Sequence, residues 1–390
     1  MVSELISKRS WATEAGTRRF VERHGDRKAA DAYTSLGGQL HLSSLGIGTY
    51  LGRPDDATDL RYEAAIVEAV RQGINVIDTA SNYRSQRSER VVGAALRQLI
   101  EMGEIYRSEV LISSKVGFVP MGDMPPMDPD AWFRSRTIDR GLADEGELNC
   151  RCHCMAPRFV TATLAQSLDN LGLETLDVYF LHNPESQLHE VDRETFLDRV
   201  RRAFMALEAA VDAGQIRVYG VSTWAGLRAA RGDRDYLSLA ELVACAEDVA
   251  GKSHHFKAVQ LPLSLHLPEA TVLHNQTVRG QVMTALEAAR ELGLAAFTCG
   301  SLHQGRLTRK LATTHPLPAD SAIPAEDEAR RPGHAALQFA RSANGVTTAL
   351  VGMSRVAHVR ENIRTLSRSR APKDWTRAVG RRPRGATIQP

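Results

Sequence analysis

Strand-like and helix-like segments alternate eight times along this chain, and this alternation constrains the fold more than any other feature. The strand-like segments are short, apolar and rich in β-branched residues, whereas the helix-like segments are longer and more polar. The expected strands span residues 45–50, 76–79, 110–116, 178–182, 218–222, 258–263, 294–298 and 348–353. Strands that alternate with helices form a parallel sheet, and eight such units close a (β/α)8 barrel.

The expected helices fill the intervals after these strands. They span residues 62–71, 89–101, 158–170, 194–213, 239–250, 269–291, 334–342 and 356–366. Gly73, Gly214 and Gly293 follow helix ends, where a left-handed residue often terminates a helix. A doubly wound open sheet is the competing architecture, but it requires a Gly-rich fingerprint after its first strand, which GIGTYLGRP does not match. We therefore expect an α/β fold of the (β/α)8 TIM barrel type.

The alternation also predicts how the chain is divided. Residues 1–32 are charged and Ala-rich and form an irregular or helical extension, and residues 33–366 form the barrel. The barrel begins with a hairpin of residues 33–36 and 39–42, joined at a Gly-Gly turn. Insertions at 119–157 and 307–332 follow the third and seventh strands, so both are expected on one face as lids or cofactor clamps. Residues 367–390 form a basic C-terminal tail.

Composition narrows the class of protein. A net charge of +3 over 390 residues gives no reason to expect binding to nucleic acid. The chain has no apolar run near the roughly 18 residues that cross a bilayer, and its N-terminus lacks the apolar core of a signal peptide. We therefore expect a cytoplasmic protein without membrane partners, with its five cysteines as free thiols.

Four residues capable of proton transfer follow the second, third and fourth expected strands: Asp78, Tyr83, Lys115 and His182. The C-terminal ends of barrel strands meet at one face, so these side chains should lie together. A Lys115 ammonium would lower the pKa of the Tyr83 phenol, and Asp78 would hold that ammonium in place. Such a site suits carbonyl reduction, with the hydride coming from a cofactor because no side chain supplies one. The other interpretation of Asp78 and Lys115 is a structural ion pair.

The ordered motifs resemble the aldo-keto reductase family over about residues 33–366, in a larger bacterial-type branch. The segments that carry the resemblance are IDTASNY, SSKVGF, DVYFLHNPE, YGVSTW, VQLPLSL and VGMSRVAHVRENI. The resemblance implies an oxidoreductase in which Tyr83 is the general acid or base, supported by Asp78, Lys115 and His182. It also implies NADPH bound across the C-terminal face of the barrel, with NADH as an alternative.

The resemblance further implies which residues contact the cofactor and a small carbonyl or alcohol substrate. The nicotinamide amide is expected at Ser222, Thr223 and Gln260, the pyrophosphate at Leu302, Gln304 and Gly305, and the adenosine end at Gly352, Ser354, Arg355, Glu361 and Asn362. Gly352 and His358 stand where basic residues are usual, so the 2′-phosphate is left to Arg355 and Arg360. Cys299 or Gly300 stands where an aromatic ring often stacks on the nicotinamide. Tyr50 and Trp224 are candidate walls of the substrate pocket.

The CRCHC segment is the one motif outside this scheme. Cys150, Cys152, His153 and Cys154 are possible zinc ligands, but alternating Cys-x-Cys spacing differs from that of common zinc sites. We expect no metal and a plain lid segment. Two alternative functions stay open: a cofactor-binding regulatory or scaffold protein without redox turnover, and a metal-dependent barrel hydrolase that uses this loop.

Overall fold

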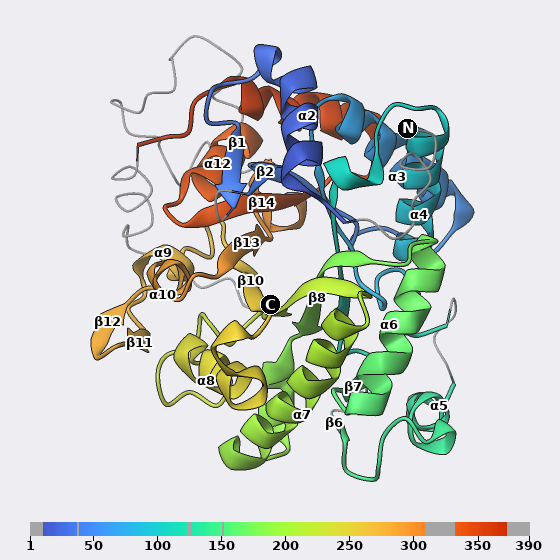
Figure 1. The fold of residues 1–390 in the computed structure, drawn as a ribbon, viewed down its shortest axis with the longest axis vertical. Coiled ribbons are helices and arrows are strands. Elements are labelled where there is room, and N and C mark those ends of the chain that lie inside the picture. The colour runs from blue at the N-terminus through green and yellow to red at the C-terminus, as the bar shows by residue number, and fades with distance from the viewer. Residues whose placement is uncertain (1–10, 37–38, 123–126, 150–151, 309–331, 373–390) are drawn as a thin grey trace.

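The computed structural model describes residues 11–36, 39–122, 127–149, 152–308 and 332–372. Eight parallel strands close into one barrel, and each lies beside its neighbours in chain order (Figure 1). They are β3 (Leu45–Gly48), β4 (Val76–Asp78), β5 (Leu111–Val116), β8 (Leu176–His182), β9 (Ile216–Ser222), β10 (Phe256–Pro262), β13 (Ala295–Cys299) and β14 (Val346–Gly352). The expected TIM barrel is confirmed.

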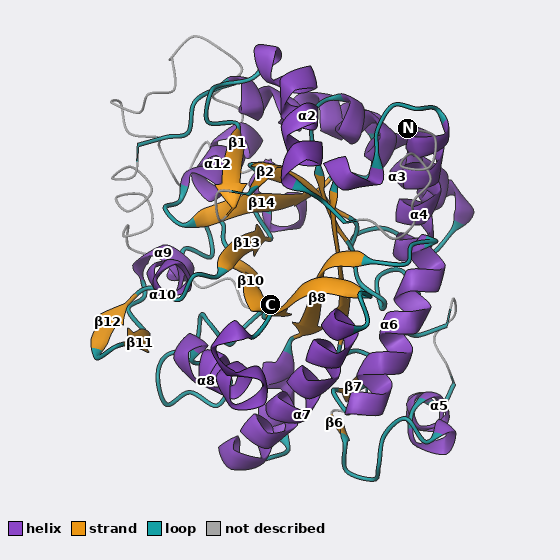
Figure 2. Cartoon of the chain, in the orientation of Figure 1, coloured by secondary structure: helices purple, strands orange, loops and turns teal. Residues whose placement is uncertain are grey.

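Helices surround the barrel and cover the outer side of its strands (Figure 2). They are α3 (Asp56–Arg71), α4 (Arg87–Glu101), α6 (Pro157–Leu171), α7 (Arg193–Asp212), α8 (Leu239–Ala250), α10 (Ala285–Glu291), α12 (Pro332–Ser342) and α13 (Val356–Asn362). Several begin where a short polar side chain accepts a bond from the first turn: Asp55 bonds to Thr58, Asp192 to Thr195 and Ser238 to Glu241. The buried faces of these helices and the strands form one continuous apolar core.

The N-terminal segment packs against the end of the barrel opposite the strand C-termini. It contains α2 (Glu14–His24) and the expected hairpin of β1 (Tyr33–Leu36) and β2 (Leu40–Ser43). Asp177, near the start of β8, is buried and accepts from the Ala12 amide at 2.5 Å and the Ile112 amide at 2.7 Å. The same carboxylate accepts from Arg107 at 2.8 Å. This one side chain therefore ties the extension to two barrel elements.

The expected helix at 269–291 is wrong. The chain instead forms α9 (Glu269–Val272), a hairpin of β11 (Gln276–Val278) and β12 (Gln281–Met283), and then α10. Arg279 and Gly280 both have positive φ, 49° and 80°, which is the backbone of a tight hairpin turn. The Asn275 amide donates to the carbonyls of Leu227 and Ala229 at 3.0 and 2.8 Å, so the loop after β9 anchors the hairpin. The hairpin projects from the barrel at the left of Figure 1.

The insertion after β5 has structure of its own. It contains α5 (Pro129–Arg136) and a two-residue ladder between β6 (Leu148–Asn149) and β7 (His153–Cys154). Its end docks on the barrel, because the Cys154 amide donates to Gly117 O at 2.7 Å and the Val119 amide to Cys152 O at 2.8 Å. Most of the second expected insertion, residues 309–331, and tail residues 373–390 lie outside the described residues. In the described part of the chain, no helix is long and apolar enough to cross a membrane.

Candidate active site

A cavity of about 850 Å³ opens at the C-terminal ends of the barrel strands. Of the residues expected in the catalytic, cofactor and substrate sites, all of which the structure describes, all but Lys115, Arg355 and Arg360 line it. The lining set therefore contains Tyr50, Asp78, Tyr83, His182, Ser222, Thr223, Trp224, Gln260, Leu302, Gln304, Gly305, Gly352, Ser354, Glu361 and Asn362. Residues far apart in the sequence thus meet around one space, as expected for the catalytic face of a barrel.

Lys115 lies behind this cavity wall and forms a buried ion pair with Asp78. Its Nζ is 2.7 Å from Asp78 Oδ2 and 2.8 Å from the carbonyl oxygen of Thr79. The Lys115 side chain is fully buried and that of Asp78 is 6% exposed. A charge in this position needs its partner, because an unpaired buried ammonium carries a large desolvation penalty.

The second oxygen of Asp78 is also occupied. Asp78 Oδ1 accepts from Ser113 Oγ at 2.8 Å and from Gln260 Nε2 at 2.9 Å. Gln260 Oε1 in turn accepts from Ser222 Oγ at 2.8 Å. Two residues expected at the nicotinamide amide, Ser222 and Gln260, therefore belong to the hydrogen-bond network that fixes Asp78.

Tyr83 lies between this ion pair and the cavity. Lys115 Nζ is 4.7 Å from the centroid of the Tyr83 ring. The Tyr83 ring packs edge-on against the rings of Tyr50 and His182, with centroid distances of 5.0 and 5.8 Å. Burial raises the pKa of Tyr83 well above its ordinary value, and the Asp78 charge, Cys299 and Tyr50 raise it further. These effects outweigh the expected lowering by Lys115. The phenol therefore holds its proton at neutral pH and can act as an acid.

His182 ends β8 on the other side of Tyr83. Burial lowers its pKa well below the ordinary value, and the charge of Lys115 and the proximity of His153 lower it further. Its ring is therefore neutral, with one N–H to donate. His182 Nδ1 is buried and has no hydrogen-bond partner within the described structure. Phe118 packs edge-on against this ring at 5.2 Å, so the imidazole is held in one orientation beside the cavity.

The backbone after Tyr83 is unusual. Arg84, Ser85 and Gln86 all have left-handed φ angles, 48°, 56° and 69°. Such angles cost free energy in residues other than glycine, so surrounding contacts must hold them. Arg84 provides such contacts: its Nε donates to Arg53 O at 3.0 Å, its Nη2 to Asp55 O at 3.4 Å, and its guanidinium pairs with Asp59.

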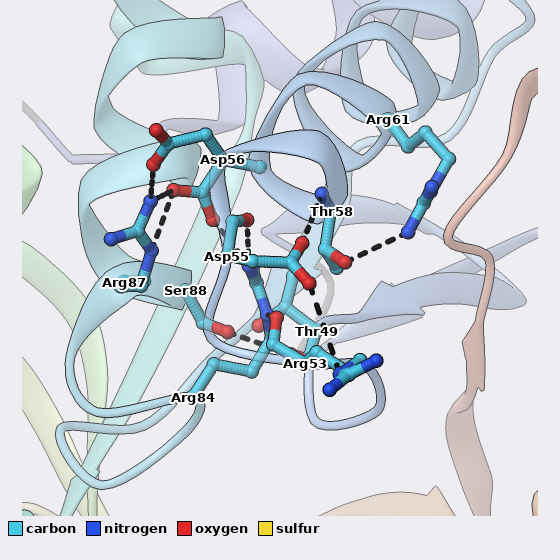
Figure 3. Close-up of polar contacts among 10 residues, drawn as sticks. Thr49, Arg53, Asp55, Asp56, Thr58, Arg61, Arg84, Arg87 and Ser88 are labelled. Carbon is cyan, nitrogen blue, oxygen red and sulfur yellow. Dashed lines mark hydrogen bonds and ion pairs between the residues drawn. The ribbon is translucent and has the colours of Figure 1, made fainter. Parts of the chain in front are cut away.

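Neighbouring residues strengthen the same junction (Figure 3). Arg87 pairs with Asp56 and donates to Asp59 Oδ2 at 2.8 Å, and Ser88 Oγ donates to Thr49 O at 2.8 Å. The Arg84 side chain is 1% exposed and packs over the ring of Tyr62 at 5.3 Å. The loop that carries Tyr83 is therefore fastened to the loop that carries Tyr50.

The cavity also contains the residues expected at the adenosine end of a dinucleotide. One continuous space is lined by Tyr83, by Ser354, Glu361 and Asn362, and by glycines at 300, 305 and 352. Arg360, expected to help with a 2′-phosphate, instead donates to Glu68 at 2.9 Å. Arg355 stands at the N-cap of α13 without a side-chain capping bond, so it remains the candidate cation.

The Cys/His segment, residues 152–154, lies beside the candidate catalytic residue His182. His153 is fully buried and both of its ring nitrogens are hydrogen bonded within the protein. Cys152 and Cys154 form no disulfide, and burial raises the pKa of Cys154 to about 12. Cys150 lies outside the described residues, and among those described no group of three or more His, Cys, Asp or Glu could hold a metal ion.

Several cavity residues were not anticipated from the sequence. Thr49, Asn82 and Phe118 all line the cavity close to Tyr83 or His182. Phe118 follows Lys115 by three residues and Asn82 precedes Tyr83, so proximity to a catalytic residue was the available signal. Cys299 also lines the cavity, where burial raises its pKa to about 12, so its thiol is protonated at neutral pH.

Comparison with known proteins agrees with this geometry. A model of the aldo/keto reductase family matches residues 44–379, which is most of the chain. The chain therefore belongs to the aldo/keto reductase family, and the expected family and enzyme class are confirmed.

Two bacterial relatives and two solved structures extend the comparison. The chain is 30% identical to the NADH-specific methylglyoxal reductase of Escherichia coli (strain K12) over 46% of its length, an alignment that spans about half (51%) of that relative. It is 26% identical to the L-glyceraldehyde 3-phosphate reductase of Escherichia coli O157:H7 over 84% of the chain and 85% of the relative. An aldo/keto reductase from Klebsiella pneumoniae in complex with NADP and acetate shares the fold, with a TM-score of 0.59, 20% identity and coverage of 92% of this chain and 99% of that one. The holo form of an aldo-keto reductase from Bacillus halodurans does so with a TM-score of 0.58 at 19% identity, covering 89% and 95% of the two chains.

Proposed function

We propose that this protein is an NADPH-dependent carbonyl reductase that reduces an aldehyde or ketone to an alcohol, or catalyses the reverse oxidation. One observation carries the proposal: Tyr83 and His182 line the same cavity, and the buried Lys115–Asp78 pair lies behind Tyr83. Burial raises the pKa of the Tyr83 phenol and lowers that of His182, which favours a protonated phenol and a neutral imidazole. Carbonyl reduction needs this combination, because the oxygen gains negative charge as hydride arrives and must be protonated.

The proposed mechanism assigns one task to each residue. The His182 N–H and the Tyr83 hydroxyl orient the substrate oxygen by donating hydrogen bonds to it. The nicotinamide, when bound, supplies the hydride. Tyr83 passes its proton to the oxygen, and Lys115, 4.7 Å from the ring, stabilises the phenolate that remains. Asp78 holds the ammonium in that position.

The walls of the cavity favour an uncharged, apolar carbonyl compound. The aromatic side chains of Tyr50, Phe118 and Trp224 line the space around the catalytic residues. The described lining residues include no Lys or Arg, so an apolar substrate would find mainly aromatic and uncharged partners beside Tyr83 and His182. We propose NADPH over NADH because Arg355 can bind a 2′-phosphate. The name of one relative, an NADH-specific enzyme, supports NADH as the alternative. We place the activity in the cytoplasm.

Replacing Tyr83 with Phe tests the proposal, because it removes the acid and keeps the ring. We expect the rate of NADPH-dependent reduction of an aromatic aldehyde to fall by roughly 100- to 10,000-fold. NADPH affinity, measured by fluorescence titration, should change little. Tyr50→Phe is the matched control, since Tyr50 also contacts the cavity but has no proton to transfer in this mechanism. Full turnover by the Tyr83→Phe variant would contradict the role of Tyr83 as the general acid.

The same measurements separate the two alternative functions. A regulatory or scaffold protein would bind NADPH without reducing any aldehyde or ketone offered. A metal-dependent hydrolase would hold a metal and lose activity to a chelator. The hydrogen bonds at both nitrogens of His153 leave that ring without a free lone pair for a metal.

A further inference from the structure

A chain of hydrogen bonds runs from the surface of α7 through the insertion to the catalytic histidine. Arg199 donates to Gln187 Oε1, and Gln187 Nε2 lies 2.8 Å from His153 Nδ1. His153 Nε2 lies 2.8 Å from the backbone carbonyl oxygen of His182. These hydrogen bonds link α7, the segment after β8, the insertion and β8 in turn, so they connect a helix with a strand of the active site.

The groups at the two ends, the Arg199 guanidinium and the His182 carbonyl, determine which atom donates and which accepts in every one of these hydrogen bonds. A guanidinium can only donate, so it occupies the oxygen of the Gln187 amide and leaves the amide N–H to face His153. His153 Nδ1 must then accept, which puts the ring proton on Nε2. A carbonyl can only accept, so the other end of the chain requires the same tautomer. Burial lowers the pKa of His153 to about 4, so the ring stays neutral at physiological pH.

His153 is also packed closely against the active site. Phe118 packs edge-on against His153 at 5.0 Å and against His182 at 5.2 Å, so one ring separates the two imidazoles. At Gly117 a Cβ would stand 2.5 Å from His182 O and 2.9 Å from His153 Nε2. The insertion and the end of β8 therefore meet with no room for even a methyl group.

We propose that His153 is a positioning residue for the reduction: as its Nε2–H tautomer it fixes the backbone carbonyl of His182, and thereby the imidazole beside Tyr83. This role rests on the proposed function only for its kinetic consequence. It also gives the Cys/His segment a task in catalysis, since Cys152 and Cys154 flank His153 and dock it on the barrel through backbone bonds.

Kinetics of two His153 variants test the role. His153→Phe fills the space but has no donor or acceptor, so we expect kcat to fall roughly 10- to 100-fold as His182 shifts. KM for NADPH should stay within about twofold, because His153 itself does not line the cavity. His153→Gln can donate to His182 O and accept from Gln187, and it should recover most of kcat. Equal kcat in wild type and His153→Phe would overturn the proposal, as would a loss that His153→Gln does not rescue.

A control variant separates positioning from general loss of folding. Phe133 is buried in α5 of the same insertion and has no hydrogen bond to the catalytic residues. Phe133→Leu should lower the melting temperature but leave kcat nearly unchanged. An equal fall in kcat for Phe133→Leu and His153→Phe at equal loss of stability would contradict a positioning role.

A spectroscopic measurement tests the tautomer without any activity. In ¹⁵N NMR spectra of histidine-labelled protein at pH 7, His153 should show a protonated Nε2 and an unprotonated Nδ1. Gln187→Glu replaces the N–H that faces His153 with an acceptor, so it should move the proton to Nδ1 or create an imidazolium. A protonated Nδ1 in the wild type would overturn the proposal. If no carbonyl substrate is reduced while the tautomer is as expected, the proposed function fails and the hydrogen-bond assignment stands.

Discussion

Arg84 illustrates how a single buried side chain can set the position of the residue before it, here the proposed acid Tyr83. The three residues after Tyr83 have left-handed φ angles, and none of them is a glycine, which would adopt such angles without strain. The guanidinium of Arg84 offsets that cost by binding two carbonyl oxygens of the opposite loop and the carboxylate of Asp59 in α3. Lysine has one ammonium instead of a planar fork, so it cannot make this set of contacts.

We predict that Arg84→Met lowers kcat by roughly 10-fold or more, because Tyr83 shifts relative to Lys115 and His182. Loss of a buried partner should also lower the free energy of unfolding by about 3 kcal/mol. Steady-state kinetics and urea denaturation measure the two effects. Arg87→Met is the matched control: it removes bonds to Asp56 and Asp59 but none to the loop backbone, so kcat should change less than twofold. Similar kcat losses in the two variants would contradict this role for Arg84.

At the level of elements, α4 and α6 approach each other so closely that the position at their contact leaves no room for a side chain. A Cβ on Gly93 in α4 would stand 2.5 Å from the carbonyl oxygen of Leu171 at the end of α6. Helix propensity alone favours alanine over glycine by about 1 kcal/mol. The steric contact opposes this gain.

We predict that Gly93→Ala destabilises the protein by about 1–3 kcal/mol, because the two helices must move apart. Thermal or urea denaturation measures the change. Gly25 provides the comparison, since its nearest neighbour to an added Cβ is Val21 Cγ1 at 3.8 Å and its φ is an ordinary −67°. Gly25→Ala should be neutral within about 0.5 kcal/mol. A Gly93→Ala variant as stable as the wild type would show that the helices separate at no cost.

Elements also mark the limit of what the sequence predicts. The eight barrel strands were found because each is a buried apolar run, and their order placed the four catalytic candidates on one face. The hairpin of β11 and β12 was missed because its apolar residues also match a helical spacing. Its anchors, Asn275 and Gln276, bond to carbonyl groups 48 and 39 residues away in the sequence. Only the Arg279-Gly280 turn carried a local signal. The partners of His153 were unpredictable for the same reason: they come from distant segments.

At the scale of the whole molecule, buried titratable groups make stability depend on pH. The pKa of His153 falls from 6.5 to about 4 because burial disfavours the imidazolium, and that of His182 is lowered for the same main reason. Glu89 and Glu185 are buried too, and burial raises their pKa values. The histidines make the folded protein less stable as the pH falls, whereas these two carboxyl groups make it less stable as the pH rises. Substitutions are therefore needed to separate their contributions to the free energy of unfolding.

We predict that the free energy of unfolding of the wild type falls more steeply than that of His153→Gln between pH 6.5 and about 4. The unfolded chain binds a proton at this histidine in that window and the folded protein does not, so stability is lost as the pH falls. The difference in slope should be about 1.4 kcal/mol per pH unit. Urea denaturation at pH 7, 6 and 5 measures it. Parallel curves for the two proteins would mean that His153 titrates normally.

The junction between the Tyr83 and Tyr50 loops has a consequence for how this enzyme can diverge. Two of the three acceptors that hold Arg84 are main-chain carbonyls, at Arg53 and Asp55, and these are present whatever side chains occupy the two positions. A substitution of Arg53 can therefore leave Tyr83 in place, whereas Asp55 is constrained for a separate reason, because its side chain caps α3. An insertion or deletion in the same stretch would move the carbonyls themselves. Its contact with Arg84 therefore constrains the length of this loop more than its side chains.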